Sequence, residues 1–375
     1  MQIIAPWVLA GFGLAGLIAA IALSPSDARS AAAQNWSPFV LVTGLLLVGL
    51  VADDDGLFAA AGHGLARTSS SGIVLFVGAT AVIAMVTAVL NLDTSVAFLT
   101  PVLVYAARSR GEGEAPLLYG CLLLSNAGSL FLPGSNLTNL IVLGHVRLTG
   151  AAFLARMWAP TLAALLATAT VVAVIERRSL RASAKKLTGA ERPTVGLGLL
   201  AVVSATLLVL TLHTPALPVA VVGVIAIGIR LATGKEKAHH VLDVLGVPML
   251  VGLFGVAVAL GTLGRVWDGP STLLSHLDAW GTAAVAAATS VLVNNLPAAS
   301  LLAARTPAHP FALLIGLNLG PNLFVTGSLA WILWLRSARG AGAQPSIAKA
   351  SRIGILAVPL SMTASLSVLV ATGVK

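Results

Sequence analysis

The chain consists mainly of long apolar runs that are separated by short polar segments. A transmembrane helix needs about 20 mostly apolar residues. The pattern therefore predicts nine crossings, at 3–23, 38–52, 115–147, 158–176, 195–212, 216–232, 244–263, 308–336 and 350–371. Two further apolar stretches, 72–107 and 279–305, are each divided by a polar tip into halves of roughly ten to eighteen residues. We interpret both as re-entrant hairpins, because each half is too short to cross the bilayer comfortably.

Two of the predicted crossings are long and contain a polar break. The crossing over 115–147 is interrupted at 133–136, and the crossing over 308–336 is interrupted at 320–322. Non-helical backbone is tolerated at membrane depth only where it is buried in protein or lines a cavity. The sequence therefore predicts an all-α polytopic membrane protein with two re-entrant hairpins and two discontinuous helices.

The polar interruptions occur in the same order in both halves of the chain. The tip at 91–94 has its counterpart at 295–298, and the break at 134–137 has its counterpart at 320–323. Five crossings separate corresponding spans, an odd number, so we expect an inverted repeat. Its parts are a first half over 1–175, a basic cytoplasmic linker over 176–193 and a second half over 194–375. Helix breaks at corresponding positions indicate a transporter that binds its solute near the bilayer midplane.

Composition supports a membrane protein, because 57% of the residues are hydrophobic and only 9% are charged. With the N-terminus in the cytoplasm, 16 of the 22 Lys and Arg lie inside and six outside, as the positive-inside rule favours. We therefore expect a plasma-membrane protein with a cytoplasmic N-terminus and an external C-terminus. The net charge of +9 is explained by loop topology and by lipid headgroups, so no nucleic acid partner is expected. The run over 3–23 is interpreted as a retained span, and segments 55–68 and 265–277 as interfacial helices.

Asp93 is the only carboxylate that this topology places at membrane depth. A charged Asp at the centre of a membrane helix costs about 2.5–3.5 kcal/mol and usually marks an ion path or a proton relay. Desolvation disfavours the charged form, whereas the N-terminus of the half-helix that begins near Thr94 favours it. Asp93 could also be the cap of that half-helix, and the two roles can coexist. We expect Asp93 to carry the coupling proton.

Amides and hydroxyls gather at both tips and both breaks. Each could serve only to cap a broken helix end, but convergence from both halves predicts one binding site. The candidate solute- or ion-binding residues are Asn91, Asp93, Thr94, Ser135, Asn136, Thr138, Asn294, Asn295, Asn322, Thr326 and Ser328. Half-helix N-termini can hold an anion or polarise a neutral solute, and free carbonyls can hold a cation. The set therefore fits more than one substrate.

Other reactive residues have simpler explanations. Cys121 is interpreted as a packing residue, and a lone cysteine excludes an internal disulfide and a cysteine metal cluster. His145 could relay protons, but we favour an interfacial or packing role. His240 is expected to be solvated, and residues 53–55 to end a helix. Because no nucleotide-binding loop or Ser-His-Asp layout occurs in a suitable context, we expect no enzyme, cofactor or metal.

Several motifs between about Val51 and Leu360 carry a resemblance to a known family. They lie at 53–58, 99–101, 135–139, 294–297, 319–321, 327–330 and 333–335. Together they resemble the ion transporter superfamily, which includes sodium/proton antiporters and citrate carriers, and most closely its bacterial arsenical pump membrane proteins. The resemblance implies export of arsenite or antimonite across the plasma membrane, driven by the proton gradient. It also implies a hairpin-bearing transport domain that moves against a scaffold.

The chain departs from the arsenical pumps at several positions. Those proteins tend to carry Asp where this chain has Asn126 and Asn318, and Lys where it has Asn322. Their tip carboxylate directly follows its Asn, whereas here Leu92 intervenes. The first half is also one helix short. Amides thus stand at three positions where the arsenical pumps tend to have ionisable groups. The resemblance alone therefore does not identify the coupling ion of this protein.

We therefore predict a secondary carrier that exports a small, largely neutral oxyacid by alternating access, with Asp93 exchanging a proton. A neutral substrate suits an amide-rich site, because neither requires a buried counter-charge. The alternatives are a carrier of inorganic or carboxylate anions and a sodium/proton antiporter. A channel or a subunit without transport is disfavoured, because a continuous pore does not need paired hairpins. The sequence leaves a homodimer and a soluble ATPase partner open.

Overall fold

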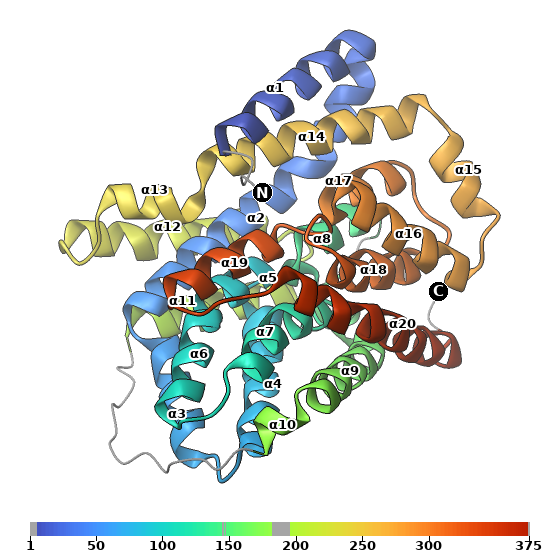
Figure 1. The fold of residues 1–375 in the computed structure, drawn as a ribbon. Helices are drawn as coiled ribbons and strands as arrows, with labels where there is room; N and C mark the ends of the chain where they lie inside the picture. The colour runs from blue at the N-terminus through green and yellow to red at the C-terminus, as the bar shows by residue number, and fades with distance from the viewer. Residues whose placement is uncertain (1–5, 145, 147, 182–195, 374–375) are drawn as a thin grey trace.

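A computed structural model describes residues 6–144, 146, 148–181 and 196–373, and the described chain is helical with no strand. Six helical segments are long and apolar enough to cross a membrane. They are α1 (Pro6–Leu23), α2 (Pro25–Asp54), α4 (Gly72–Val89), α9 (Gly150–Ile175), the joined α13–α14 segment (Ala238–Val266) and α20 (Ile347–Ala371). Shorter apolar helices complete the bundle (Figure 1). The predicted all-α polytopic membrane protein is thus confirmed.

The remaining helices follow the predicted segments closely. In the first half they are α3 (Leu57–Thr68), α5 (Leu92–Thr94), the π-helical turn η1 (Ser95–Leu99), α6 (Thr100–Ser109), α7 (Ala115–Gly128), the 3-10 turn η2 (Pro133–Ser135), α8 (Leu137–Leu143) and α10 (Arg177–Leu180). In the second half they are α11 (Leu197–Thr211), α12 (Ala216–Ala232), α13 (Ala238–Leu245), α14 (Val247–Val266), α15 (Gly269–Ser275), α16 (Ala279–Val293), α17 (Asn295–Leu302), α18 (Pro310–Leu319), the 3-10 turn η3 (Gly320–Leu323) and α19 (Ala330–Gly340).

Helix breaks occur at all four positions where the sequence has polar interruptions. In the first hairpin stretch, α4 ends at Val89 and α5 begins at Leu92; in the second, α16 ends at Val293 and α17 begins at Asn295. The two long crossings divide into α7 and α8 and into α18 and α19. At three of the interruptions an Asn side chain caps the helix that follows, namely Asn91, Asn136 and Asn294. The second break combines Gly320 with Pro321, and no side chain caps α19. These residues explain why the apolar flanks do not continue as one helix. That the hairpins enter and leave on one side of the membrane stays a prediction.

The two halves of the sequence pack reciprocally. Helix α1 of the first half lies along α14 of the second, while α12 of the second half lies along α2 of the first (Figure 1). Helices α9 and α20 form another extensive contact. Gly13 of α1 meets Gly252 of α14, and Gly44 of α2 meets Ala220 of α12, so small residues allow close helix approach. The halves therefore interlock and do not form separate globular units.

Burial divides the helices into a core and a periphery. Residues 116–128 of α7 and 310–319 of α18 are buried without interruption, as expected of helices surrounded by protein on all sides. Peripheral helices expose large apolar side chains such as Phe12, Leu200 and Leu217, which suit contact with lipid chains. Most of the predicted linker and also His145 lie outside the described residues, so their predicted roles are not addressed by the structure.

Candidate functional site

All four helix interruptions meet around one small cavity, here named the site cavity. Its volume is about 20 Å³, which suffices for a water-sized group. Its lining comprises Leu92 and Asp93 from the first tip, Asn136 and Leu137 from the first break, Leu253 from α14, and Asn294, Asn295 and Leu296 from the second tip. The second break contributes Ser328, Leu329 and Ala330, where the interrupted segment ends and α19 begins, and not residues 320–323. Segments that are about 200 residues apart in sequence thus share one polar pocket.

The first tip is capped by Asn91. Its extended backbone places the side-chain Oδ1 2.6 Å from the Thr94 N–H, which donates to it. The suggestion that Asp93 is the cap of this half-helix is therefore wrong, because Asn91 precedes the first free N–H groups and satisfies one of them. Asp93 lies inside the first turn, and its side chain reaches the site cavity. The Asp93 carboxylate therefore does not cap α5.

The second tip is tied directly to the second break. The Asn295 N–H donates to the Gly327 carbonyl at 2.8 Å, and the Asn294 side-chain amide donates to the Thr326 carbonyl at 3.2 Å. Asn294 has φ 80°, the only positive φ at a non-glycine residue in the described part of the chain. Such backbone is strained for an L-residue and is typical of functional sites. Its side-chain Oδ1 also accepts from the Leu296 N–H, which caps α17.

Behind the first break lies a cluster of neutral side chains that joins the two discontinuous helices. This amide cluster comprises Asn126, Ser129, Asn136, Asn139, Asn318 and Asn322. Asn318 Oδ1 accepts from Ser129 Oγ at 2.6 Å and from Asn136 Nδ2 at 2.7 Å, and Asn318 Nδ2 donates to Asn139 Oδ1 at 2.8 Å. Asn126 Nδ2 donates to Asn322 Oδ1 at 2.9 Å. Ser129 and Asn139 were not proposed as site residues from the sequence. Their signal was a polar side chain within or next to an otherwise apolar helix.

The predicted site residues fall into three groups in the structure. Five line the site cavity: Asp93, Asn136, Asn294, Asn295 and Ser328. Five are buried behind its wall: Asn91, Thr94, Ser135, Thr138 and Asn322. Thr326 is exposed, and its hydroxyl donates to the Val291 carbonyl at 2.7 Å. The sequence did not single out the apolar wall, to which Leu253 of α14 contributes.

Several buried polar atoms near the site have no hydrogen-bond partner among the described residues. They include Asn91 Nδ2, Thr94 Oγ1, Thr138 Oγ1 and Ser328 Oγ. A buried polar group that stays unpaired costs about 1–3 kcal/mol. Water or a bound solute at these positions would remove that cost, and Ser328 already faces the site cavity.

A larger cavity of about 400 Å³, here named the vestibule, shares Asp93 with the site cavity. The two also share Leu137, Leu253 and Leu329. The vestibule is further lined by α2, α13, α14 and α19, and its ionisable residues besides Asp93 are His240, Asp243 and Arg336. Asp93 thus lies where the site cavity meets the vestibule.

His240 of α13, which lines the vestibule, contacts Glu236 in the loop before that helix. His240 Nδ1 lies 3.0 Å from Glu236 Oε1. Burial raises the pKa of Glu236, but hydrogen bonds from the Lys237 N–H and from His240 outweigh burial and hold that pKa below its ordinary value. Glu236 is therefore a carboxylate beside His240. The side chain of His240 is 50% exposed, so it is solvated as the sequence suggested, although it has this partner.

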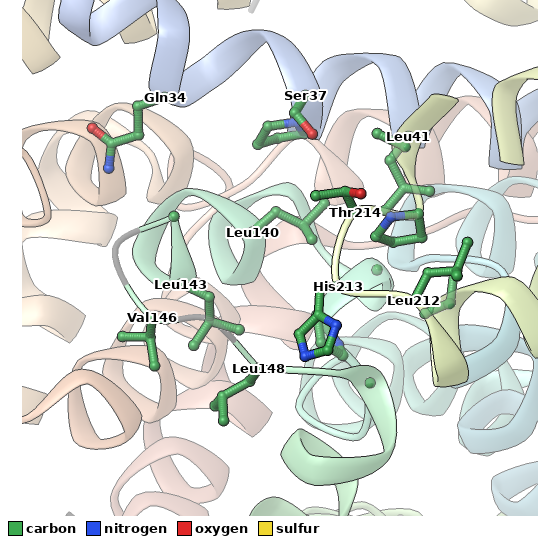
Figure 2. A pocket seen from close by; sticks show the side chains of 18 of the residues that line it. Gln34, Ser37, Leu41, Leu140, Leu143, Val146, Leu148, Leu212, His213 and Thr214 are labelled. Atoms are coloured by element: carbon green, nitrogen blue, oxygen red, sulfur yellow. The ribbon is translucent and has the colours of Figure 1, made fainter. Parts of the chain in front are cut away.

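A third cavity of about 680 Å³, here named the α8 cavity, is lined in part by α8 (Figure 2). Gln34 and Ser37 of α2, Leu140 and Leu143 of α8, and His213 contribute to its lining. Gln34 Nε2 donates to the carbonyls of Ile141 and Ala303, both at 2.9 Å. None of the predicted site residues lines this α8 cavity.

Comparison with known proteins assigns the family. Residues 1–334 match the profile of the citrate transporter family. The chain belongs to this family. This citrate transporter family member is also similar to the arsenical pump membrane protein of Escherichia coli. The two sequences are 24% identical over 337 residues, and the aligned region covers 80% of this chain and 78% of that protein. Its fold resembles the crystal structure of the YdaH transporter of Alcanivorax borkumensis, with a TM-score of 0.55 and 15% identity over 92% of this chain and 88% of that chain. It is therefore a multi-pass membrane transporter.

Proposed function

We propose that this transporter is a secondary active carrier that exports arsenite or antimonite across the plasma membrane in exchange for protons. The observation that carries the proposal is the composition of the site cavity. Four helix interruptions supply amides, a hydroxyl and one carboxylate, and no Lys, Arg or His is among the described residues that line it. The chemistry of this lining suits a small neutral polyhydroxyl solute, because no buried counter-charge is required, and the adjoining vestibule of about 400 Å³ offers the space that the site cavity alone lacks.

The charge of the site argues against a polyanionic solute. At neutral pH citrate carries several negative charges, and in the site cavity it would meet the Asp93 side chain without a basic side chain to compensate. Like charges in a buried site repel strongly. Arsenous acid carries no charge and has three hydroxyl groups, each able to donate or accept a hydrogen bond. The match to the arsenical pump membrane protein supports the same solute class.

Asp93 offers a direct means of coupling solute to proton. In its anionic form the carboxylate accepts hydrogen bonds from the hydroxyl groups of the solute. Once it is protonated, it loses acceptor capacity and its charge, so solute affinity falls. Solute and proton therefore compete for one group, and such competition is what exchange across a membrane requires.

The positions of the cavities fit export by alternating access. With the N-terminus in the cytoplasm, His240 and Arg336 lie on the cytoplasmic side, and so does the vestibule that leads to Asp93. The α8 cavity then lies toward the outside. We propose that the structure represents the state that receives solute from the cytoplasm. Hairpins that enter from opposite faces would close off one side at a time.

A carrier of carboxylate anions is the second candidate. It is favoured by the family match and by Arg336 in the vestibule, whose guanidinium suits a carboxylate. Half-helix N-termini at the site cavity would add favourable partial charge. A sodium/proton antiporter has less support, because only one carboxylate lines the site cavity.

Uptake into everted membrane vesicles separates these candidates. Vesicles that contain the protein and vesicles without it receive radiolabelled arsenite, citrate, succinate or sodium, each with and without an acidic lumen. We expect arsenite to accumulate only when the lumen is acidic. Arsenite accumulation that ignores the proton gradient would remove the exchange mechanism. Movement of citrate or succinate without movement of arsenite would establish the second candidate.

A further inference from the structure

Asn318 of α18 uses its whole hydrogen-bonding capacity without touching the site cavity. Its Oδ1 accepts from Ser129 Oγ and Asn136 Nδ2. Its Nδ2 donates to Asn139 Oδ1 and to the Leu314 carbonyl, both at 2.8 Å. The side chain is fully buried and is not among the residues that line the cavity. A primary amide has two acceptor sites and two N–H donors, so the orientation of this one is fixed.

Asn136 is the site residue that Asn318 holds. Asn136 lines the site cavity at the first break. One N–H of its Nδ2 donates to Asn318, and its Oδ1 accepts from the Thr138 N–H at 3.2 Å, which caps α8. These two contacts fix both ends of the amide. One N–H and one Oδ1 lone pair are left over for a solute or a water molecule.

We propose that Asn318 is a positioning residue that orients Asn136 toward the transported solute. The inference rests on the proposed function for the presence of a solute in the site cavity. A side chain of the second half thereby sets the geometry of a solute contact in the first half. The amide is required chemically, because an aspartate at position 318 would present an oxygen to Asn139 Oδ1 and to the Leu314 carbonyl, both of which need a donor.

Asn126 provides a matched control. It belongs to the same amide cluster, is equally buried on α7, and donates to Asn322 Oδ1 and to the Leu122 carbonyl. None of these partners lines the site cavity. Loss of the Asn126 amide therefore removes hydrogen bonds of the same kind without releasing a cavity-lining side chain.

The test measures arsenite KM and Vmax in everted vesicles with an acidic lumen, normalised to folded protein from size-exclusion chromatography. Asn318→Ala is expected to raise KM about tenfold, the equivalent of one hydrogen bond, while Vmax changes by less than about threefold. Asn126→Ala should leave KM within about twofold of the unmodified protein. In an Asn136→Ala background, Asn318→Ala should raise KM no further, because its effect passes through the missing amide.

Three outcomes would overturn the proposal: an unchanged KM in folded Asn318→Ala, an equal KM rise in Asn126→Ala, or full additivity with Asn136→Ala. Asn318→Ser is a second variant with a smaller loss of packing and the same expected KM rise. If neither variant folds while Asn126→Ala does, Asn318 is structural and the proposal fails. Absence of arsenite transport by the unmodified protein would instead refute the proposed function, and the KM comparison would then be made with citrate.

Discussion

The side-chain amides of Asn126 and Asn322 are hydrogen bonded to each other at 2.9 Å, although the two residues are 196 positions apart. Asn126 lies on α7 and Asn322 in η3, so the bond joins the two discontinuous helices. The resemblance to the arsenical pumps implies Asp at the first position and Lys at the second. Two of the positions that depart from that pattern are therefore in direct contact and form a neutral pair.

A charge introduced at one residue of this pair should destabilise the protein, and opposite charges at both residues should restore its stability. Asn126→Asp leaves a buried carboxylate without a cation, which costs about 3–5 kcal/mol. Asn126→Asp combined with Asn322→Lys supplies the cation and should recover most of the loss. The check is the thermal unfolding midpoint of the purified proteins in detergent. A double variant no more stable than the single variant would show that the two positions do not interact as a pair.

Asp93→Asn should separate solute movement from proton movement. The amide keeps the volume but cannot exchange a proton, so arsenite should still equilibrate and show counterflow, while accumulation against a gradient should be lost. Proteoliposomes loaded with arsenite measure both activities. Asp243→Asn serves as the control, because this carboxylate lines the vestibule but not the site cavity. Undiminished pH-driven accumulation in Asp93→Asn would leave the proposed exchange without its proton carrier.

Each transport cycle should move one proton per solute molecule. Asp93 is the sole ionisable side chain among the described residues around the site cavity, and the amide cluster behind it is neutral. In proteoliposomes with the membrane voltage clamped at zero, a tenfold arsenite gradient should be balanced by about one pH unit. Without a pH difference it should be balanced by about 59 mV. A balance point at half those values would require a second coupled proton and hence a second titrating group.

Gly354 should tolerate no side chain. A Cβ at this position of α20 would overlap the Asn322 carbonyl oxygen in η3, and overpacking of this kind costs about 1–3 kcal/mol. Gly354→Ala should therefore lower the unfolding midpoint in detergent. Gly228→Ala on α12 is the matched control, since a Cβ there meets nothing within 4 Å. Gly228→Ala should leave the free energy of unfolding unchanged or raise it by up to about 1 kcal/mol. Equal midpoints for the two variants would contradict the packing of α20 against η3.

The sequence predicted the fold well because its helix breaks depend on local chemistry. Clusters of Asn, Gly, Pro and other polar residues inside apolar runs disrupt helices, so the tip near Asn91 and the break near Gly320 could be located without a structure. Single prolines do not have this effect here, since Pro38, Pro160 and Pro359 lie inside α2, α9 and α20. The length of each apolar run fixed most of the helices. Local rules also explain the cap at Asn91, although the choice between Asn91 and Asp93 depended on where the backbone becomes extended.

Contacts between distant segments could not be predicted in the same way. The partners of Asn318 lie about 180–190 residues away, and no period or spacing indicates which amides meet. Likewise, Thr326 seemed equivalent to Ser328 in sequence, yet one is exposed and the other lines the site cavity. Only Gly327 separates them, and tertiary packing decides which side chain faces inward.

We infer that all four helix interruptions contribute to one solute site. The most direct test of this inference is the affinity of the purified protein for radiolabelled arsenite, measured for one variant from each interruption: Asp93→Asn, Asn136→Ala, Asn295→Ala and Ser328→Ala. The exposed Thr326→Ala is the control. We predict that each of the four weakens binding at least about fivefold, since each removes one polar contact, and that Thr326→Ala binds normally. Weakened binding only in variants from one half of the chain would contradict a shared site.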